Sequence, residues 1–256
     1  LKGVQEYKDK KPDERLKFYF KYLDNADPEI AMDAFKEFAN APYADYRDMA
    51  KGLPADKLAG WLKDPNTPGF RIGLYGSLLG HCGKEEDAKL LRSLLEDPQR
   101  KLSTGVDGVL AGYTMIDPKQ GWDYIKAIMR DPNRDFLMRY AALRAARFFH
   151  DYRPDLVTPT KELAEGVAPL LGQKDIADLA VEDLRKWGCK DMTDRVLGMQ
   201  STEAYKTLPI VRRSVLRFAL SFPEVPADAA YVAEQRKTNP QGVSEAEEIL
   251  KLEQGK

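Results

Sequence analysis

Residues 64–98 read DPNTPGFRIGLYGSLLGHCGKEEDAKLLRSLLEDP, and this stretch decides the fold. It begins and ends on an Asp-Pro pair, and Gly83 divides it into two segments. Four leucines of the second segment follow the 3.6-residue period of a helix: Leu90, Leu91, Leu94 and Leu95. The stretch therefore predicts a pair of helices, 68–82 and 84–96, with a turn at each end.

The Asp-Pro pair recurs along the chain. It stands at regular intervals of 37, 33 and 34 residues, at Asp27-Pro28, Asp64-Pro65, Asp97-Pro98 and Asp131-Pro132. A Leu-Pro pair at Pro209 follows about two intervals later, and Asp117-Pro118 falls off the period and indicates a turn inside a unit. Proline favours the turn before a helix or its first turn, and aspartate there accepts bonds from free N–H groups. Each periodic pair predicts the turn between two repeat units.

The apolar period indicates two helices in each unit and no alternating strand. We expect a leading helix at 13–24, the pairs 28–40 with 54–63, 68–82 with 84–96, 102–116 with 119–130, 134–151 with 160–171, 174–188 with 190–200 and 207–221 with 226–237, and a last helix at 244–252.

The predicted fold class is all-α, an α-solenoid of about six helix pairs. One pair cannot bury its apolar face alone, so the stack is expected to behave as a single domain over residues 1–256. Residues 1–12 would form a polar lead-in, and the helices at 13–24 and 244–252 would cap the two ends.

Small residues spaced four apart predict close contacts between these helices. Gly76 and Gly80 form one such pair, and Gly108 and Gly112 form another. Residues four apart share a helix face, and glycine costs up to about 1 kcal/mol per helix position relative to alanine. We interpret these glycines as points where two helix backbones approach each other.

The turn motif resembles that of the HEAT-repeat family. An Asp-Pro-Asn turn, a later arginine and a small-residue helix occur twice, at 64–66 with Arg71 and at 131–133 with Arg139; Arg213 holds a similar place after Pro209. The resemblance covers roughly residues 28–240 and is weak in the fifth unit, where Lys174-Asp175 replaces Asp-Pro. It implies a right-handed HEAT-like solenoid with a concave layer of second helices, and protein binding as the usual role.

The chain also resembles the repeat region of uncharacterised bacterial exported proteins, in segments such as Ala146-Arg147-Phe148-Phe149 and 183–187. This resemblance implies export. The chain begins at Leu1, and the polar segment 1–14 carries four lysines without an apolar signal. We therefore expect the chain to be a trimmed or mature C-terminal part of a longer protein, so that any signal peptide and any N-terminal domain would precede Leu1; the compartment stays open.

Composition excludes some classes of function. Lys and Arg total 40 against 41 Asp and Glu, a formal net charge of −1, whereas a nucleic-acid binder usually carries a basic excess. The longest run without these four residue types is 72–83, 12 residues, and a membrane-spanning helix needs about 20 apolar residues. We expect no membrane span and no nucleic-acid partner.

The four His and Cys residues of the chain, His81, Cys82, His150 and Cys189, lie at or near ends of predicted helices in three different units. A zinc ion needs its ligands within about 2.0–2.3 Å, and packed helices lie about 8–10 Å apart. We therefore expect no metal site and no disulfide. No nucleophile, dinucleotide or phosphate-loop motif occurs, so we expect no catalytic residue and no cofactor.

Two enzymatic or accessory alternatives remain. HEAT-like DNA glycosylases that remove alkylated bases use this architecture with aromatic residues and a carboxylate on a basic concave face, and the chain contains Trp61, Trp187 and Trp122 beside Asp123. The second alternative is an accessory lyase or a maturation factor. The favoured function is non-catalytic: a scaffold that binds a protein partner or an N-terminal domain of the same chain.

The candidate partner-binding residues lie on the predicted helix 119–130, a member of the second-helix layer. They are Trp122, Asp123, Lys126 and Arg130. Residues three and four apart share a helix face, and an aromatic anchor among charges is typical of protein-binding hot spots. The alternative is that Trp122 is buried with Ile125 and that the charged residues form solvated surface.

Overall fold

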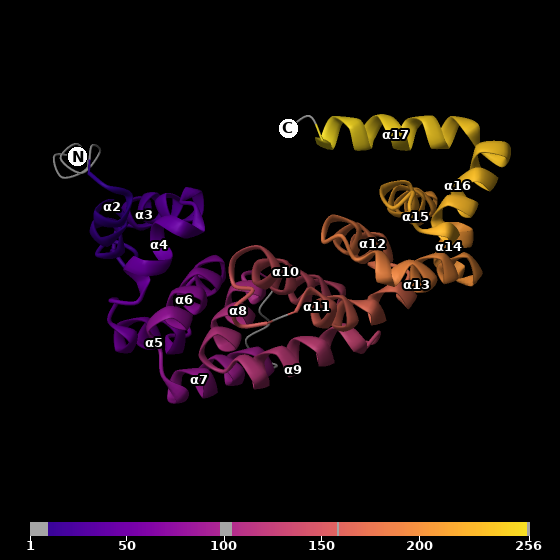
Figure 1. Ribbon diagram of the computed structural model, residues 1–256. Coiled ribbons are helices and arrows are strands. Elements are labelled where there is room, and N and C mark those ends of the chain that lie inside the picture. The colour runs from indigo at the N-terminus through magenta and orange to yellow at the C-terminus, as the bar shows by residue number, and fades with distance from the viewer. Residues whose placement is uncertain (1–9, 98–103, 158, 255–256) are drawn as a thin grey trace. The chain divides into compact units, whose positions relative to one another are not determined.

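The computed structural model describes residues 10–97, 104–157 and 159–254 (Figure 1). Every regular element in these ranges is a helix, and they contain no strand, which confirms the all-α fold class. Three parts of the sequence-based prediction lie outside the described residues: positions 1–9 of the polar lead-in, Pro98 of the third Asp-Pro pair, and residues 102–103 of one expected helix.

The described chain divides into two compact units, with the boundary between Asp123 and Tyr124, inside one helix. The first unit contains α2 (Pro12–Phe20), α3 (Pro28–Asn40), α4 (Tyr43–Ala50), α5 (Ala55–Lys63), α6 (Gly69–Cys82), α7 (Glu85–Glu96), α8 (Val106–Ile116) and the start of α9 (Pro118–Arg130). The second contains the rest of α9, α10 (Phe136–Tyr152), α11 (Thr160–Val167), η1 (Ala168–Gly172), α12 (Ala177–Lys186), η2 (Lys190–Met192), α13 (Thr193–Gly198), η3 (Met199–Ser201), α14 (Glu203–Thr207), α15 (Pro209–Ser221), α16 (Pro226–Thr238) and α17 (Pro240–Gln254).

Most helices match the prediction to within about four residues. The helix predicted at 160–171 is α-helical to Val167 and continues as the 3-10 helix η1, and there are three further differences. The helix α4 was not expected, because its eight residues lie between turns that sequence analysis joined into one connection. The helix predicted at 190–200 is instead the short series η2, α13 and η3, followed by α14, which starts where the Thr202 side chain accepts the Tyr205 N–H. The last helix, α17, is longer than the predicted 244–252.

The Asp-Pro turns are built by their aspartates. Asp27 caps α3 by accepting the backbone N–H of Glu29 at 2.9 Å, with Pro28 in the first turn. Asp64 and Asp131 accept the backbone N–H two residues later in the same way, at 2.8 and 3.0 Å, but their donors Asn66 and Asn133 lie in the turn ahead of the next helix and not inside it. Asp135 then caps α10 itself. The predicted role of aspartate thus holds for the turn, and only some of these residues cap a helix directly.

In the first unit, α6 packs against α8 through the predicted glycines. A side-chain carbon added to Gly73 would lie 2.6 Å from the Cα atom of Gly105, and one added to Gly76 would lie 2.9 Å from the Cα atom of Val109. Gly105 has φ of 75°, a left-handed conformation that suits glycine, and α8 begins directly after it. The backbones of α6 and α8 therefore touch, as the spacing of Gly76, Gly80, Gly108 and Gly112 predicts.

In the second unit, partly buried ion pairs connect α10 to α12 and α12 to α15. Arg147 of α10 donates through Nε to both carboxylate oxygens of Asp183 of α12 at 2.7 Å. Glu182 of α12 accepts from Arg217 of α15 at 2.8 Å and from Arg185 at 2.9 Å. These pairs lie among fully buried apolar side chains, which include Leu143, Phe149, Val181, Leu184, Val215 and Phe218.

Within the described residues, no helix combines the length and the apolar character that crossing a bilayer requires.

Candidate functional site

The candidate site is a groove of about 540 Å³ in the second unit. Its lining comes from α9, α11, η1, α13, η3 and the turn after η3: Arg130, Glu165, Ala168, Pro169, Leu171, Gly172, Arg195, Gly198, Met199 and Thr202. These elements occupy the second-helix positions of three successive predicted pairs. A volume of this size is within the range of known ligand sites, about 300–1,000 Å³.

Charged groups lie at the sides of the groove. Arg195 of α13 donates to Glu165 of α11 at 2.8 Å, and both side chains are about half exposed. Arg130, at the end of α9, is exposed and has no polar partner among the described residues. The two guanidinium groups and one carboxylate leave the groove with one excess positive charge, at Arg130.

The floor of the groove is apolar, and two of its residues are glycines that have no side chain to fill the space above them. A side-chain carbon added to Gly172 or Gly198 would meet no heavy atom within 4 Å, so both glycines border open space. Met199 and Leu171 lie beside them and are buried. Methionine is flexible and polarisable, so it adapts to different apolar partners. The floor can therefore accept an apolar side chain of more than one shape.

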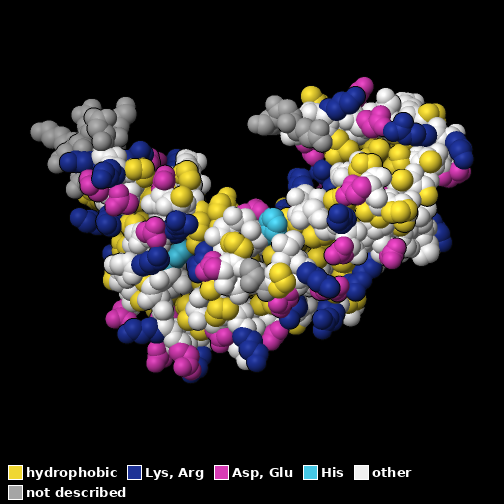
Figure 2. Space-filling model, viewed as in Figure 1, with side chains coloured by type: hydrophobic (Ala, Val, Ile, Leu, Met, Phe, Trp, Pro, Cys, Tyr) yellow, Lys and Arg dark blue, Asp and Glu magenta, His cyan; other side chains and the backbone are white. Residues whose placement is uncertain are grey.

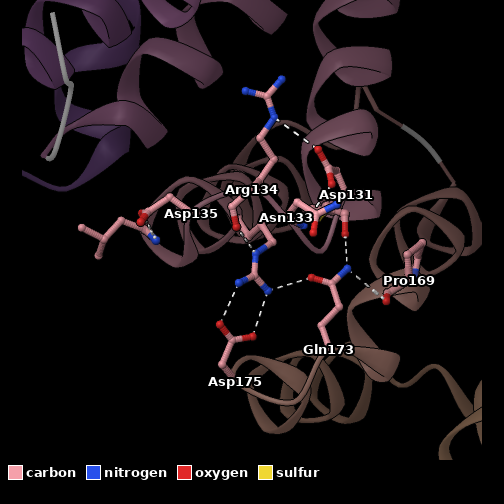
Figure 3. Close-up of polar contacts among 10 residues, drawn as sticks. Asp131, Asn133, Arg134, Asp135, Pro169, Gln173 and Asp175 are labelled. Carbon is pink, nitrogen blue, oxygen red and sulfur yellow. Dashed lines mark hydrogen bonds and ion pairs between the residues drawn. The ribbon is translucent and has the colours of Figure 1, made fainter. Parts of the chain in front are cut away.

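A buried polar network holds the groove in place (Figure 3). The Gln173 side chain follows η1 and donates through Nε2 to the carbonyl oxygen of Met129 at 2.7 Å and to that of Pro169 at 3.3 Å. Met129 directly precedes Arg130, and Pro169 forms part of the groove floor. One amide group therefore connects the end of α9 to η1 and fixes the position of Arg130 relative to the floor.

Arg139 orients this amide. Its Nη1 donates to Oε1 of Gln173 at 2.7 Å, its two Nη atoms donate to Asp175 at 2.9 and 2.7 Å, and its Nε donates to the carbonyl of Arg134 at 2.9 Å. The Arg139 guanidinium holds the pKa of the Asp175 carboxyl below its usual value. Arg139 is 4% exposed, so the bidentate pair and the hydrogen bonds compensate the burial of its charge.

The three motif arginines have three different environments. Arg139 contacts Asp175, which stands where the fifth unit departs from the Asp-Pro pattern. Arg71 donates to the carbonyl oxygen of Leu23 at 3.0 Å, an acceptor that it shares with the Tyr75 hydroxyl. Arg213 is exposed and has no polar partner in the described part of the chain.

The predicted partner-binding residues separate into two sets. Trp122 is 4% exposed, and its Nε1 is buried without an acceptor among the described residues, so this ring lies in the interior. Asp123 and Arg130 are exposed, and Lys126 is half-buried with its Nζ 3.9 Å from Glu162. Of the four, only Arg130 lines the groove.

Sequence analysis did not identify Glu165 and Arg195, which face Arg130 across the groove. They belong to no local motif, because each comes from a different helix. No sequence signal links the three residues: Arg130 is the last residue of α9, whereas Glu165 lies inside α11 and Arg195 inside α13, so only the packing of these helices brings them to one groove.

The histidines and cysteines occupy separate environments. His81 packs beside the rings of Tyr43 and Tyr46, and His150 stacks on the Trp187 ring with 4.9 Å between centroids. Both cysteines are free thiols, and burial raises the pKa of each to about 11. In the described ranges, no three His, Cys, Asp or Glu side chains are grouped as metal ligands would be.

Comparison of the chain with protein-family models, curated proteins and solved structures gives no match.

Proposed function

We propose that this protein is a non-catalytic scaffold that binds an extended segment of a partner protein in the groove at Arg130. In this proposal the helix pairs stack as a right-handed HEAT-like solenoid of about six pairs, and the groove lies on its second-helix layer. The observation that carries the proposal is the groove itself, whose lining comes from α9, from α11 with η1, and from α13 with η3, and is held by the buried Gln173 amide.

The charges of the groove favour a particular kind of segment. Arg130 offers an unengaged guanidinium, and the low floor at Gly172 and Gly198 offers room for an apolar side chain. Guanidinium binds carboxylate with two parallel hydrogen bonds, and arginine and apolar anchors are enriched at protein interfaces. The proposed ligand is a peptide that places a carboxylate at Arg130 and an apolar side chain on the floor.

The surface charge also supports a protein partner. On the face drawn in Figure 2, Lys and Arg side chains are interspersed with Asp and Glu side chains in both units. Binding to duplex DNA depends strongly on neutralising phosphates with a basic surface. A mixed surface of this kind suits a protein ligand better than a nucleic acid.

A random-peptide library displayed on phage, selected against the full chain, tests this proposal. The decisive variant is Gly198→Phe, which fills the groove; no heavy atom lies within 4 Å of the added Cβ, and the backbone φ of −58° is ordinary. We expect enriched peptides to lose binding to Gly198→Phe and to bind Arg130→Gln about fivefold more weakly, the size of an exposed ion pair.

Arg213→Gln is the matched control, because Arg213 is also exposed and unengaged but lies on α15, away from the groove. It should leave peptide binding unchanged. The proposal is wrong if no peptide is enriched on the wild-type chain, or if the enriched peptides bind Gly198→Phe as tightly as the wild type.

A further inference from the structure

A second hollow, of about 490 Å³, lies between the last three helices. It shares no lining residue with the groove at Arg130. The helices that line it, α15, α16 and α17, contact one another and are drawn in orange to yellow in Figure 1. Its walls are Ala219, Leu220, Pro223, Ala229, Val232, Ala233, Arg236, Glu247, Leu250 and Lys251. Seven of these ten residues are apolar, so the interior of the hollow is almost entirely aliphatic.

The hollow exists because the facing side chains are small. Ala229 and Ala233 lie four apart on one face of α16, and Ala219 of α15 lies at the base with 1% exposure. Ala229 and Ala233 are themselves exposed, so the hollow opens to solvent over this face of α16 and is not an enclosed void. Leucine at the two α16 positions would fill the space, so alanine there keeps it open.

Charged groups occur only at the rim. Arg236 of α16 donates to Glu247 of α17 at 2.6 Å, which neutralises both. Lys251 lies one helical turn after Glu247, is exposed, and has no polar partner among the described residues. The rim therefore carries one uncompensated positive charge beside an aliphatic interior.

We propose that this hollow binds a free aliphatic monocarboxylate, with its hydrocarbon chain between α15 and α16 and its carboxylate at Lys251. The match is one of chemistry: an apolar body for the alanine and leucine walls, and one negative charge for one positive charge. Glu247 opposes a ligand with two negative charges, because the rim offers a net charge of only one. This inference is independent of the proposed peptide groove.

Titration of the full chain with octanoate, followed by NMR chemical shifts, tests the site. We expect saturable binding near one octanoate per chain, with shifts confined to α15, α16 and α17. Octanol and octylammonium have the same hydrocarbon chain as octanoate but a different head group, so they show how much of the binding depends on the carboxylate. Octanol should bind about two- to fivefold more weakly, because it lacks the exposed ion pair, and octylammonium more weakly still.

Variants test the apolar wall and the charged rim of the hollow separately. Ala233→Phe fills it and should abolish octanoate binding, whereas Ala230→Phe, at an exposed α16 position outside the lining, is the matched control and should not. Lys251→Gln should weaken binding about two- to fivefold. Glu247→Gln should strengthen it, since it removes the negative charge from the rim.

Each alternative result overturns a defined part of the proposal. Octanoate binding that survives Ala233→Phe, or no saturable binding at all, refutes the hollow as the site. Equal affinity for octanoate and octanol, or no effect of Lys251→Gln, refutes the carboxylate assignment. Neither result bears on the groove at Arg130.

Discussion

Replacing Gly73 with alanine would place a methyl group between two helix backbones. The added carbon would lie 2.6 Å from Cα and 2.7 Å from the carbonyl oxygen of Gly105, where ordinary contact begins near 3.4 Å. All of these neighbours are backbone atoms, so no flexible side chain can turn away. Helices α6 and α8 must move apart by about 0.8 Å at this point.

The free energy of this change is the sum of two opposing terms. Overpacking of this kind costs about 1–3 kcal/mol, and a gap of about 0.5–1 Å elsewhere along the interface forfeits a quarter to a half of each dispersion contact. Alanine regains up to about 1 kcal/mol of helix propensity. We expect a net loss of about 1 kcal/mol, which lowers Tm by about 2–4 °C in a chain of this size.

The assay is urea unfolding followed by circular dichroism, with Gly60→Ala as the control. Gly60 is an exposed residue inside α5, and a carbon added there meets nothing within 4 Å. The same substitution should therefore stabilise the protein by up to about 1 kcal/mol at Gly60 and destabilise it at Gly73. If Gly73→Ala is as stable as the wild type, α6 and α8 do not approach as closely as described.

Three further predictions concern titrating groups. Burial raises the pKa of Asp183 to about 6, and the Arg147 guanidinium opposes this rise. The variant Arg147→Met should therefore move the pKa of Asp183 above 6 in an NMR titration of the carboxyl group, and an unchanged pKa would contradict the ion pair. Burial also raises the pKa of Asp228, so its ionisation costs stability. The wild type should therefore lose stability relative to Asp228→Asn as the pH rises from below the ordinary Asp pKa of about 3.9 through the raised folded-state pKa. Urea unfolding of both proteins across this pH range measures the difference, and a difference that does not change with pH would contradict the prediction. Cys82 and Cys189, with thiol pKa values of about 11, should react slowly with iodoacetamide at neutral pH in the folded chain, and buried Cys189 more slowly than partly exposed Cys82. Rapid labelling of both thiols would contradict the raised pKa values.

The helices could be predicted because their ends are marked locally. Proline and aspartate at Asp27-Pro28 determine where α3 starts, and Pro118 and Pro209 begin α9 and α15 in the same way. The series η2, α13 and η3 could not be predicted as separate pieces. Its apolar period continues across the breaks, and periodicity alone does not distinguish α-helix from 3-10 helix over three residues.

The site could be predicted only in part, because a helix face is a local property and a groove is not. Arg130 was identified from its spacing on one helix, but Trp122 shares the buried side of α9 with Ile125 and Met129, both fully buried. Spacing places residues on the same face without showing which face meets solvent. Gly172 and Gly198 appear in the sequence as ordinary turn residues, and only the packing of three helices makes them a floor.

The contact between Arg185 and Glu253 has a consequence for how the C-terminal end opens. A helix with few neighbours usually opens before the core of a protein does. Here Arg185 of α12, 7% exposed, donates to Glu253 of α17 at 2.7 Å, and α17 also packs on α15 and α16. Detaching α17 would therefore remove an acceptor from a buried guanidinium on a helix that precedes α15. Amide hydrogens of α17 and α15 should consequently exchange with solvent together, in one cooperative opening, rather than one helix at a time from the end.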